Sequence, residues 1–348
     1  MQINLFSWRF TMSKTILPEG YTPLLSIYET QRAIGLLKRL FEDDLSGALR
    51  LHRVSAPLFV SATSGLNDDL NGVERPVAFD VNGVKDTAQV VHSLAKWKRL
   101  ALKRYQFAPG EGLYTDMNAI RRDEDLDSLH SAYVDQWDWE KIITADQRNA
   151  EYLKETVRSI VSALADTQKV LCSVFPQLSV LPRLPKEVTF VTSQELEDLY
   201  PELDGKGREN AFVKEHPVTF IIGIGGKLRS GKPHDGRAPD YDDWSLNGDL
   251  LVWDSIGQRA MELSSMGIRV DPESLDRQLS ISGCDNRREL PFHKMLLNGE
   301  LPLTMGGGIG QSRVSMLLLG KAHIGEVQSS LWDEENMSAC EEAGVILL

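Results

Sequence analysis

Alternate glycines followed by an arginine are the residues of this sequence that point most directly to chemistry. In segment 306–313, Gly306, Gly308 and Gly310 lead to Arg313, and an apolar run follows. Clustered glycine is costly inside an element, so the pattern indicates a strand that something flat or charged approaches closely. An arginine in the first turn of the next helix would meet phosphate oxygens there. The segment therefore predicts a nucleotide site, and a tight turn with a solvated Arg313 is the alternative.

Four aspartates come close together along the chain at the start of a predicted strand. Asp240, Asp242 and Asp243 precede the strand, and Asp249 opens it. Carboxylate oxygens are the ligands that Mg²⁺ takes beside substrate phosphates, and they also bind ribose hydroxyls or ammonium groups. A solvated acidic turn without a function is the alternative. Asp249 argues against this alternative, because an unpaired carboxylate at the edge of a packed sheet would be costly.

Cationic residues that suit phosphate or carboxylate groups lie elsewhere along the chain. This set consists of Lys98, Arg121, Arg122, Arg269 and Arg313. Arg122 is most simply a surface cation, whereas Arg121 and Arg269 lie beside strand patterns in which exposed charge is not expected. Two such arginines near a strand of glycines would bind an α-phosphate and a substrate carboxylate.

Polar and aromatic residues alternate in one further predicted strand. The alternation places Gln136 and Asp138 on one face and Asp135, Trp137 and Trp139 on the other. One face must then carry a carboxylate and an amide into the interior. An edge strand with its polar face in water is the alternative.

Two other nucleotide-binding patterns are incomplete. Residues 226–232 spell G-x-x-x-x-G-K, but Pro233 stands where the metal-binding Ser or Thr of a P-loop belongs. Gly223 and Gly225 are followed by Leu228 where a dinucleotide fingerprint requires a third glycine. The sequence therefore supports neither a P-loop nor a site for hydride chemistry.

The elements that must position these residues follow from hydrophobic periodicity. Apolar residues at helical spacing predict long helices over about 21–49 and 146–175. Shorter helices are predicted after Ser93, as the N-cap, and at 194–200, 206–215 and 272–281. Strands are predicted at 51–60, 77–81, 89–92, 112–122, 131–139, 187–192, 218–224, 249–253 and 261–270. Because strands outnumber strand–helix–strand units, we expect an α+β fold with a mainly antiparallel sheet flanked by helices.

Composition limits the classes of protein to which this chain can belong. Its 348 residues carry a formal net charge of −12, so we expect no nucleic-acid partner, which would require a basic face. Cys172, Cys284 and Cys340 are far apart, which fits a reducing compartment, and we expect a cytoplasmic protein. We expect no membrane span, because no apolar run approaches the roughly 20 residues needed. Residues 1–20 are expected to form a poorly ordered extension, and residues 21–348 one catalytic domain.

Six blocks of the sequence together resemble one family, the ammonia-dependent asparagine synthetases of the A type. The similarity runs from about Tyr21 to Val327, and its blocks are 92–99, 110–115, 133–140, 237–245, 263–270 and 306–313. The family resembles the catalytic domain of class II aminoacyl-tRNA synthetases, and its members are homodimers. The resemblance implies that segment 306–313 is the third class II signature and that Arg121 is the arginine of the second.

The resemblance also implies an activity, that of an aspartate–ammonia ligase. Such an enzyme converts L-aspartate, ATP and ammonia to L-asparagine, AMP and pyrophosphate through a β-aspartyl adenylate, with Mg²⁺ bridging the phosphates. The β-carboxylate and the α-phosphate are both anions, so Arg121 and Arg313 would neutralise charge as they meet. Asp68 would hold the incoming ammonium and take its proton, because only neutral ammonia attacks the acyl carbon. Its neighbour Asp69 is the alternative carboxylate for this role.

Each half of the implied site has its own residues. Those implied for ATP or AMP are Arg121, Leu129, Asp242, Asp249, Ser265, Gly306, Gly308 and Arg313. Those implied for aspartate are Ser93, Lys98, Gln136, Asp138 and Arg269. Asp242 and Asp249 would also contact Mg²⁺ through the phosphates. The implied catalytic residues are Asp68, Arg121, Gln136 and Arg313.

The chain departs from the family pattern in a few places. Between Ser245 and Leu246 it lacks a short loop that bacterial members carry. The tail after Val327 diverges, and we assign it no function. The resemblance also gives no role to the N-terminal extension.

Three other functions were weighed against the ligase. An aminoacyl-tRNA synthetase would need a second, basic domain, whereas the catalytic blocks occupy nearly the whole acidic chain. A non-catalytic adenylate-binding module would be expected to lack Arg121, Gln136 or Arg313, and all three are present. A glutaminase mechanism normally needs a cysteine at the mature N-terminus, and none precedes Cys172. Direct use of glutamine as an alternative nitrogen donor stays open.

Overall fold

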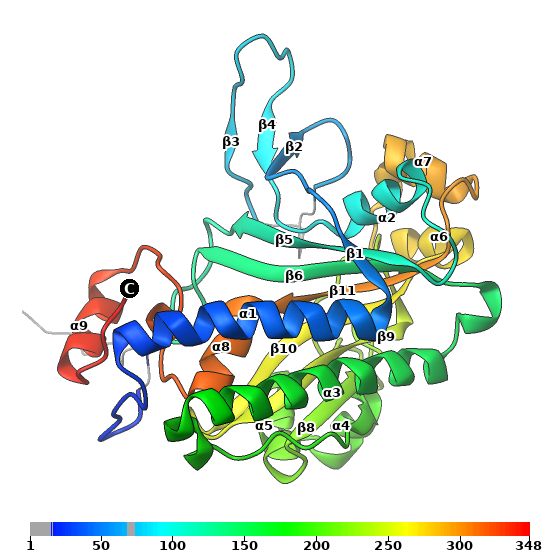
Figure 1. Cartoon of the computed structure of the whole chain (residues 1–348). Coiled ribbons are helices and arrows are strands. Elements are labelled where there is room, and N and C mark those ends of the chain that lie inside the picture. Colours follow the sequence, from blue (N-terminus) through cyan, green and yellow to red (C-terminus); the bar gives the residue numbers. More distant parts are fainter. Residues whose placement is uncertain (1–14, 16, 68–73) are drawn as a thin grey trace, which may run out of the picture.

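A large β-sheet forms the centre of the protein (Figure 1). The structure is a computed structural model that describes residues 15, 17–67 and 74–348. Within these residues the sheet has eight strands, in the order β1-β5-β6-β11-β10-β9-β8-β7. The strands are β1 (Leu51–Arg53), β5 (Gly112–Ile120), β6 (Tyr133–Ile142), β11 (Thr304–Gly310), β10 (Arg259–Arg269), β9 (Asp242–Asp254), β8 (Val218–Ile222) and β7 (Thr189–Thr192). A separate small sheet consists of β2 (Phe59–Ser61), β4 (Ala88–Val90) and β3 (Ala78–Phe79).

Most neighbouring strands of the large sheet are antiparallel. Among the described strands, only the outermost pairs, β1 with β5 and β7 with β8, run parallel. The five pairings between β5 and β8 are all antiparallel. The predicted mainly antiparallel sheet is therefore confirmed.

Two long helices, α1 (Ile27–Leu49) and α3 (Ala150–Val174), pack against each other and cover one face of the sheet (Figure 1). The main core lies between these helices and the sheet. Trp137 and Trp139 of β6 are fully buried there, and the ring of Phe41 from α1 lies 4.7 Å from that of Trp137, centroid to centroid. Because side chains alternate along a strand, the opposite face of β6 is left for polar residues.

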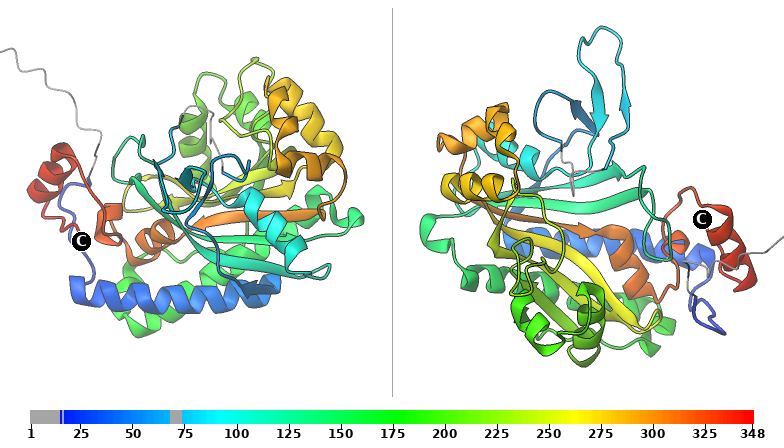
Figure 2. Two further views of the ribbon diagram at one scale, coloured as in Figure 1. Left: turned by 90° about the horizontal axis from the view of Figure 1, so that it is seen from above. Right: turned by 180° about the vertical axis from the view of Figure 1, so that it is seen from behind.

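α8 packs against α1 and β6 on the face that the long helices cover, and the other helices lie around the opposite face and the edges of the sheet (Figure 2). α2 packs on β5, β6 and β11, α5 packs on β9 and β10, and α8 follows β11 directly. These helices are α2 (Ala95–Arg104), α4 (Ser193–Leu199), α5 (Gly205–Glu215), α6 (Pro272–Ile281), α7 (Pro291–Leu297), α8 (Gln311–Leu319) and α9 (Glu334–Glu342). Four short 3₁₀ helices complete the described elements: η1 (Ala145–Gln147), η2 (Pro176–Val180), η3 (Asp285–Glu289) and η4 (Ile324–Glu326). No helix in the described part of the chain is both long and apolar enough to cross a membrane.

Local hydrogen bonds set several boundaries that periodicity did not predict. The first helix begins at Ile27 and not near Tyr21, because the side chains of Ser26 and Glu29 cap each other's backbone N–H groups. The segment predicted as one strand, 51–60, forms the two short strands β1 and β2. The predicted elements occur in the predicted order, but helices α7 (Pro291–Leu297) and α9 (Glu334–Glu342) were not predicted.

The prediction that Ser93 is the N-cap of α2 was wrong. Leu94 occupies that position, and no side chain caps the helix there. The Ser93 hydroxyl instead accepts a hydrogen bond from the backbone N–H of Ala95 at 3.1 Å. This side-chain turn from Ser93 to Ala95 precedes the first turn of α2. Ser93 itself lines the cavity described below.

Both ends of the described chain meet near the start of α1 (Figure 1). Thr15 is buried and its hydroxyl donates a hydrogen bond to Asn336 of α9, in the tail to which we assigned no function. The rest of the predicted extension up to that point, residues 1–14, lies outside the described residues, as does residue 16.

Candidate active site

A cavity of about 490 Å³ opens on the face of the sheet opposite α1 and α3. Gln136 and Asp138 line it, on the side of β6 opposite Trp137. Their predicted projection into the interior is confirmed, and the edge-strand alternative is wrong, because β6 lies between β5 and β11. Eleven of the residues predicted for the site line this cavity: Ser93, Lys98, Arg121, Leu129, Gln136, Asp138, Asp242, Ser265, Arg269, Gly308 and Arg313.

Three predicted residues are not among those that line the cavity. Asp249 lies beneath it, bound to Arg237, and Gly306 lies beneath the Glu140–Arg269 pair. Asp68 and its neighbour Asp69 lie outside the described residues.

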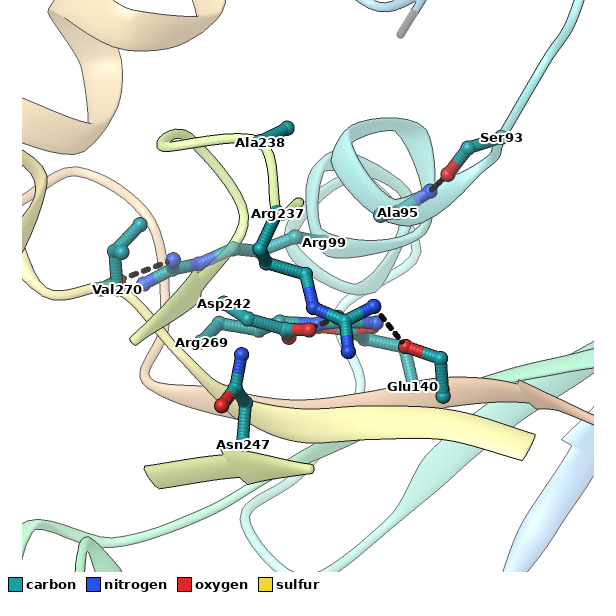
Figure 3. Close-up of polar contacts among 12 residues, drawn as sticks. Ser93, Ala95, Arg99, Glu140, Arg237, Ala238, Asp242, Asn247, Arg269 and Val270 are labelled. Atoms are coloured by element: carbon teal, nitrogen blue, oxygen red, sulfur yellow. Dashed lines mark hydrogen bonds and ion pairs between the residues drawn. The ribbon is translucent and has the colours of Figure 1, made fainter. Parts of the chain in front are cut away.

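A buried ion network of Glu140, Arg269 and Asp242 forms part of the cavity floor (Figure 3). Arg269 Nε and Nη2 donate to the Glu140 carboxylate at 2.7 to 3.0 Å, and Nη1 donates to Asp242 Oδ1 at 2.5 Å. Burial alone would lower the pKa of Arg269, but the two carboxylates outweigh it and raise the pKa above its ordinary value. Arg269 is therefore a fixed positive charge at the cavity.

The glycines of β11 make room for this network. A Cβ atom on Gly306 would overlap the Glu140 carboxylate, and one on Gly308 would overlap the side-chain amide of Gln136. A close approach to this strand therefore occurs at both positions, but the approaching groups are side chains of the protein itself, a carboxylate at Gly306 and a neutral amide at Gly308. At Gly306 this leaves no room for a nucleotide base against the strand.

A second buried pair, Lys98 with Asp138, stands beside the first. Lys98 Nζ donates to Asp138 Oδ1, to the carbonyl oxygen of Trp139 at 2.8 Å and to that of Gly307 at 3.3 Å. Burial is the main cause that lowers the pKa of Lys98 and raises the pKa of Asp138. Both shifts favour the neutral forms of the two groups.

Arg237, which the sequence analysis did not single out, holds two predicted residues together. Its Nη1 donates to Ser265 Oγ and its Nη2 to Asp249 Oδ1, both at 2.6 Å. Burial, with a contribution from the negative charge of Glu262, raises the pKa of Asp249 to about 6, although Arg237 opposes the shift. Arg237 lies in the same block as the aspartates. A single arginine in a predicted loop does not indicate a binding residue, so the sequence did not distinguish Arg237 from a surface cation.

Arg313 and Arg121 mark the end of the cavity farther from Lys98 and Asp138 along β11 and β5. Arg313 lies in the first turn of α8, as predicted, and its Nη1 donates to the carbonyl oxygen of Glu262 at 2.9 Å. Arg121 Nη1 lies 3.8 Å from Glu124 Oε2, and its buried Nε has no hydrogen-bond partner among the described residues. Arg122 is exposed, as expected for a surface cation.

Glu262 and Lys206 are two further cavity residues that the sequence analysis missed. Arg313, Lys206 and Arg237 outweigh burial and lower the pKa of Glu262, so it is ionised. Lys206 Nζ lies 2.9 Å from Glu209 Oε2 within α5. Glu262 had a usable signal, since it is a charged residue inside an otherwise apolar strand pattern, the same reasoning that selected Arg269.

The solvated-turn alternative for the four aspartates is wrong, because all of them are buried and paired. Asp240 pairs with Lys96, Arg287 and His293, and Asp243 pairs with Arg148. Asp242 and Asp249 bind different arginines, Arg269 and Arg237. Within the described residues no three His, Cys, Asp or Glu side chains are arranged to hold a metal on their own.

β9 is continuous from Asp242 to Asp254, through Ser245 and Leu246. The pairing of β9 with β10 is irregular here. Asn247 pairs with Gly267 and Asp242 pairs with Arg269, so five residue steps of β9 lie opposite two of β10. Asn247 then fixes the strand, since its side chain exchanges hydrogen bonds with the backbone of Ile224 at 2.9 and 3.0 Å. Asp242, at the other end of this irregularity, pairs with Arg269 of β10 and lines the cavity.

Comparisons with solved structures support the fold. Asparaginyl-tRNA synthetase of Entamoeba histolytica, solved with asparaginyl-adenylate, matches with a TM-score of 0.62 at 13% identity, over 87% of this chain and 66% of that one. The enzyme of the same name from Pyrococcus horikoshii, also with asparaginyl-adenylate, matches with a TM-score of 0.60 at 14% identity, over 89% and 72%. The predicted class II synthetase-like fold is confirmed.

Comparisons of sequence define the family. The family model described as aspartate-ammonia ligase matches residues 28–344. Aspartate–ammonia ligase of Clostridium perfringens is 62% identical over 338 residues, which is 97% of this chain and all of that protein. The ligase of Ruminiclostridium cellulolyticum is 59% identical with the same coverage. The chain therefore belongs to the aspartate–ammonia ligase family.

Proposed function

We propose that this protein is an ATP-dependent ligase that makes L-asparagine from L-aspartate and ammonia, releasing AMP and pyrophosphate through a β-aspartyl adenylate. The observation that carries the proposal is a single cavity with two unlike ends. One end has the buried pairs Lys98–Asp138 and Arg269–Glu140, and the other has Arg121 and Arg313. Family membership agrees with this arrangement.

The end with the buried pairs suits an amino acid with two carboxylates and one ammonium group. Each terminal nitrogen of a guanidinium carries two N–H donors, so Arg269 keeps free donors for the substrate α-carboxylate beside its bonds to Glu140 and Asp242. Asp138 and Gln136 offer oxygens to the substrate ammonium. The charges already present in the protein thus match those of aspartate.

The end with Arg121 and Arg313 suits the α-phosphate of ATP. An oxygen of the substrate β-carboxylate attacks the α-phosphorus as the bond to the β-phosphate breaks and pyrophosphate leaves. Two anions approach each other in this step, so the two guanidinium groups lower its barrier by neutralising charge. Leu129 and Ser265 line the same cavity and would contact the nucleotide.

Mg²⁺ is the proposed cofactor, and we revise its contacts. Asp242 and Asp249, the carboxylates first expected to contact it, are bound to Arg269 and Arg237, whereas the ionised Glu262 lines the cavity. The carboxylate of Glu262, beside Arg313 at the phosphate end, is an oxygen ligand of the kind that a divalent cation takes. Bound there with the phosphates, Mg²⁺ would neutralise negative charge on ATP and pyrophosphate.

The amination step is proposed for Asp68. Ammonia attacks the acyl carbon of the adenylate, AMP leaves, and the nitrogen loses a proton to a carboxylate. Asn67, the preceding residue, accepts a hydrogen bond from the backbone N–H of His92 at 2.9 Å, directly before Ser93 of the cavity. The role of Asp68, or of its neighbour Asp69, is proposed on the family resemblance.

We further propose that residues 21–348 act as one catalytic unit and that the protein is a cytoplasmic homodimer. The free cysteines, among them Cys172 and Cys284, agree with a reducing compartment. The distribution of site residues from Ser93 to Arg313 over one sheet supports a single unit.

The test is aspartate-dependent exchange of labelled pyrophosphate into ATP with Mg²⁺, followed by addition of ammonium. Exchange together with asparagine and AMP supports the ligase and its adenylate. Exchange without asparagine would mean that the adenylate goes to another acceptor, as in a synthetase. Binding of ATP without exchange would favour a non-catalytic module, and glutamine in place of ammonium tests the alternative nitrogen donor.

A further inference from the structure

Asp240 joins the loop beside the cavity to helix α2. Its carboxylate is fully buried, and Oδ2 lies 3.2 Å from Lys96 Nζ, 2.9 Å from Arg287 Nη1 and 2.9 Å from His293 Nε2. The three cationic or titratable partners come from α2, η3 and α7. Burial alone would raise the pKa of Asp240, but these partners outweigh it and hold the pKa far below its usual range. One charged oxygen therefore links three elements to the segment before β9.

The elements joined by Asp240 carry cavity residues on both sides. Arg237 and Asp242 lie in the same segment as Asp240, and Lys98 lies two residues beyond Lys96. Figure 3 shows Arg237 and Asp242 close to the Arg269–Glu140 pair, with Ser93 at the start of α2 nearby. Neither Asp240 nor Lys96 is among the described residues that line the cavity.

Lys96 and Lys98 hold α2 in two different directions. Residues two apart on a helix point to different sides, so Lys98 binds the sheet through Asp138, while Lys96 binds the loop through Asp240. Arg99 adds a bond to the carbonyl oxygen of Val270 at 2.6 Å. The ammonium of Lys96 joins α2 to the segment of Asp240, and its contact with Asp240 Oδ2 sets the separation between these two walls.

We infer that the Asp240–Lys96 ion pair positions the two walls of the aspartate site, α2 with Ser93 and Lys98 on one side and the segment with Asp242 on the other. The inference rests on the proposed function, which places aspartate between these walls. A positioning pair of this kind prepares the site for one substrate, so its loss weakens the binding of aspartate more than that of ATP. A purely structural pair would change stability alone.

The test is the variant Lys96→Met in the full-length protein. It keeps an apolar stem of similar length and leaves Asp240 paired with Arg287 and His293, so no carboxylate is left buried alone. We expect the KM for aspartate to rise about tenfold, with the KM for ATP and the kcat at saturating aspartate changed less than about twofold. An unchanged KM for aspartate in the folded variant would overturn the inference.

The matched control is Arg148→Met. Arg148 binds Asp243, a buried aspartate of the same run, at 2.6 Å, and neither of these two residues lines the cavity within the described chain. We expect this variant to lose thermal stability and keep the wild-type KM for aspartate. An equal rise of the KM for aspartate in both variants would also overturn the inference. It would show that loss of any buried ion pair in this region disturbs the aspartate site.

Two further measurements keep the outcomes separate. If Lys96→Met does not fold, Lys96→Gln replaces it, because glutamine keeps a hydrogen-bond donor toward Asp240 without the charge. The KM for aspartate of this variant is then compared with that of wild type and of Arg148→Met. Calorimetric titration of aspartate runs in parallel with the kinetics. A wild-type protein that makes no asparagine refutes the proposed function, whereas the comparison of aspartate affinities between wild type and variants still decides the role of Lys96.

Discussion

Glu140 and Arg269 form a buried ion pair directly above Gly306. Arg269 Nε lies 3.0 Å from each carboxylate oxygen of Glu140, and a Cβ atom on Gly306 would overlap that carboxylate. The glycine is thus required by an ion pair of the protein and not by backbone conformation. Because both charges are buried, neither can move into water to make room.

Gly306→Ala should therefore disturb the aspartate end of the cavity. We expect a loss of about 1–3 kcal/mol in the free energy of unfolding, the usual cost of overpacking, and a higher KM for aspartate. Thermal unfolding and steady-state kinetics measure the two effects. The control is Gly226→Ala, where the added methyl group meets nothing within 4 Å. Equal behaviour of both variants would contradict the explanation.

Arg313→Ala should remove charge neutralisation at the α-phosphate. We expect kcat to fall by about 10²–10³ with the fold intact, because the interaction is made mainly in the transition state. Arg229→Ala is the control, since Arg229 is exposed and pairs with Asp198 at the surface. Near-normal turnover of Arg313→Ala, with pyrophosphate exchange retained, would rule out the proposed role.

Asp68→Asn should separate the two half-reactions. The variant is expected to catalyse aspartate-dependent pyrophosphate exchange at a near-normal rate and to form little asparagine, because an amide cannot take the proton from ammonium. Asp69→Asn is the matched variant and shows which of the two carboxylates acts. If exchange and asparagine formation are lost together, the assignment to amination is incorrect.

Lys206→Met should weaken the binding of ATP. Lys206 lies in the cavity near Glu262, at the phosphate end, so its ammonium is placed to meet the β- or γ-phosphate. We expect the KM for ATP to rise about tenfold and the KM for aspartate to stay unchanged. Lys214→Met, on the exposed side of the same helix, provides the comparison. Equal KM values for ATP in the two variants would count against a phosphate contact.

Cys340 should resist alkylation in the folded protein. Burial is the main cause that raises the pKa of its thiol to about 11, so at pH 8 the reactive thiolate is scarce and shielded. Cys172 and Cys284 are only partly buried and should react first. Mass spectrometry after treatment with iodoacetamide, with and without denaturant, measures this order. Rapid labelling of Cys340 without denaturant would mean that α9 is not held as described.

Local sequence patterns predicted most of the helices and strands, and for β6 they also predicted which side chains lie on each face of the sheet. Trp137 and Gln136 were assigned to opposite faces of one strand, which holds because the side-chain period of a strand is two residues. The position of Arg313 in the first turn of a helix followed from the glycines before it and the apolar run after it. The resemblance to a ligase family supplied the function, and the comparisons confirmed the family.

Ion pairs between residues far apart in the sequence could not be predicted from local patterns. The run of aspartates read equally well as a solvated turn, and its burial became evident only when Asp240 met Lys96, Arg287 and His293, which lie up to 144 residues away. The same holds for Glu262, whose closeness to Arg313 depends on the packing of α8 against β10.

The sequence by itself therefore determined most of the helices and strands in their order, the two faces of β6 and the family, because these depend on short-range periodicity and on similarity along the chain. The tertiary structure alone decided which charges neutralise one another. It assigned Asp242 to Arg269 and Asp249 to Arg237, and it filled the space over Gly306 with Glu140. Such pairings depend on strand order and register, which bring distant residues within a few ångströms and which no local pattern specifies.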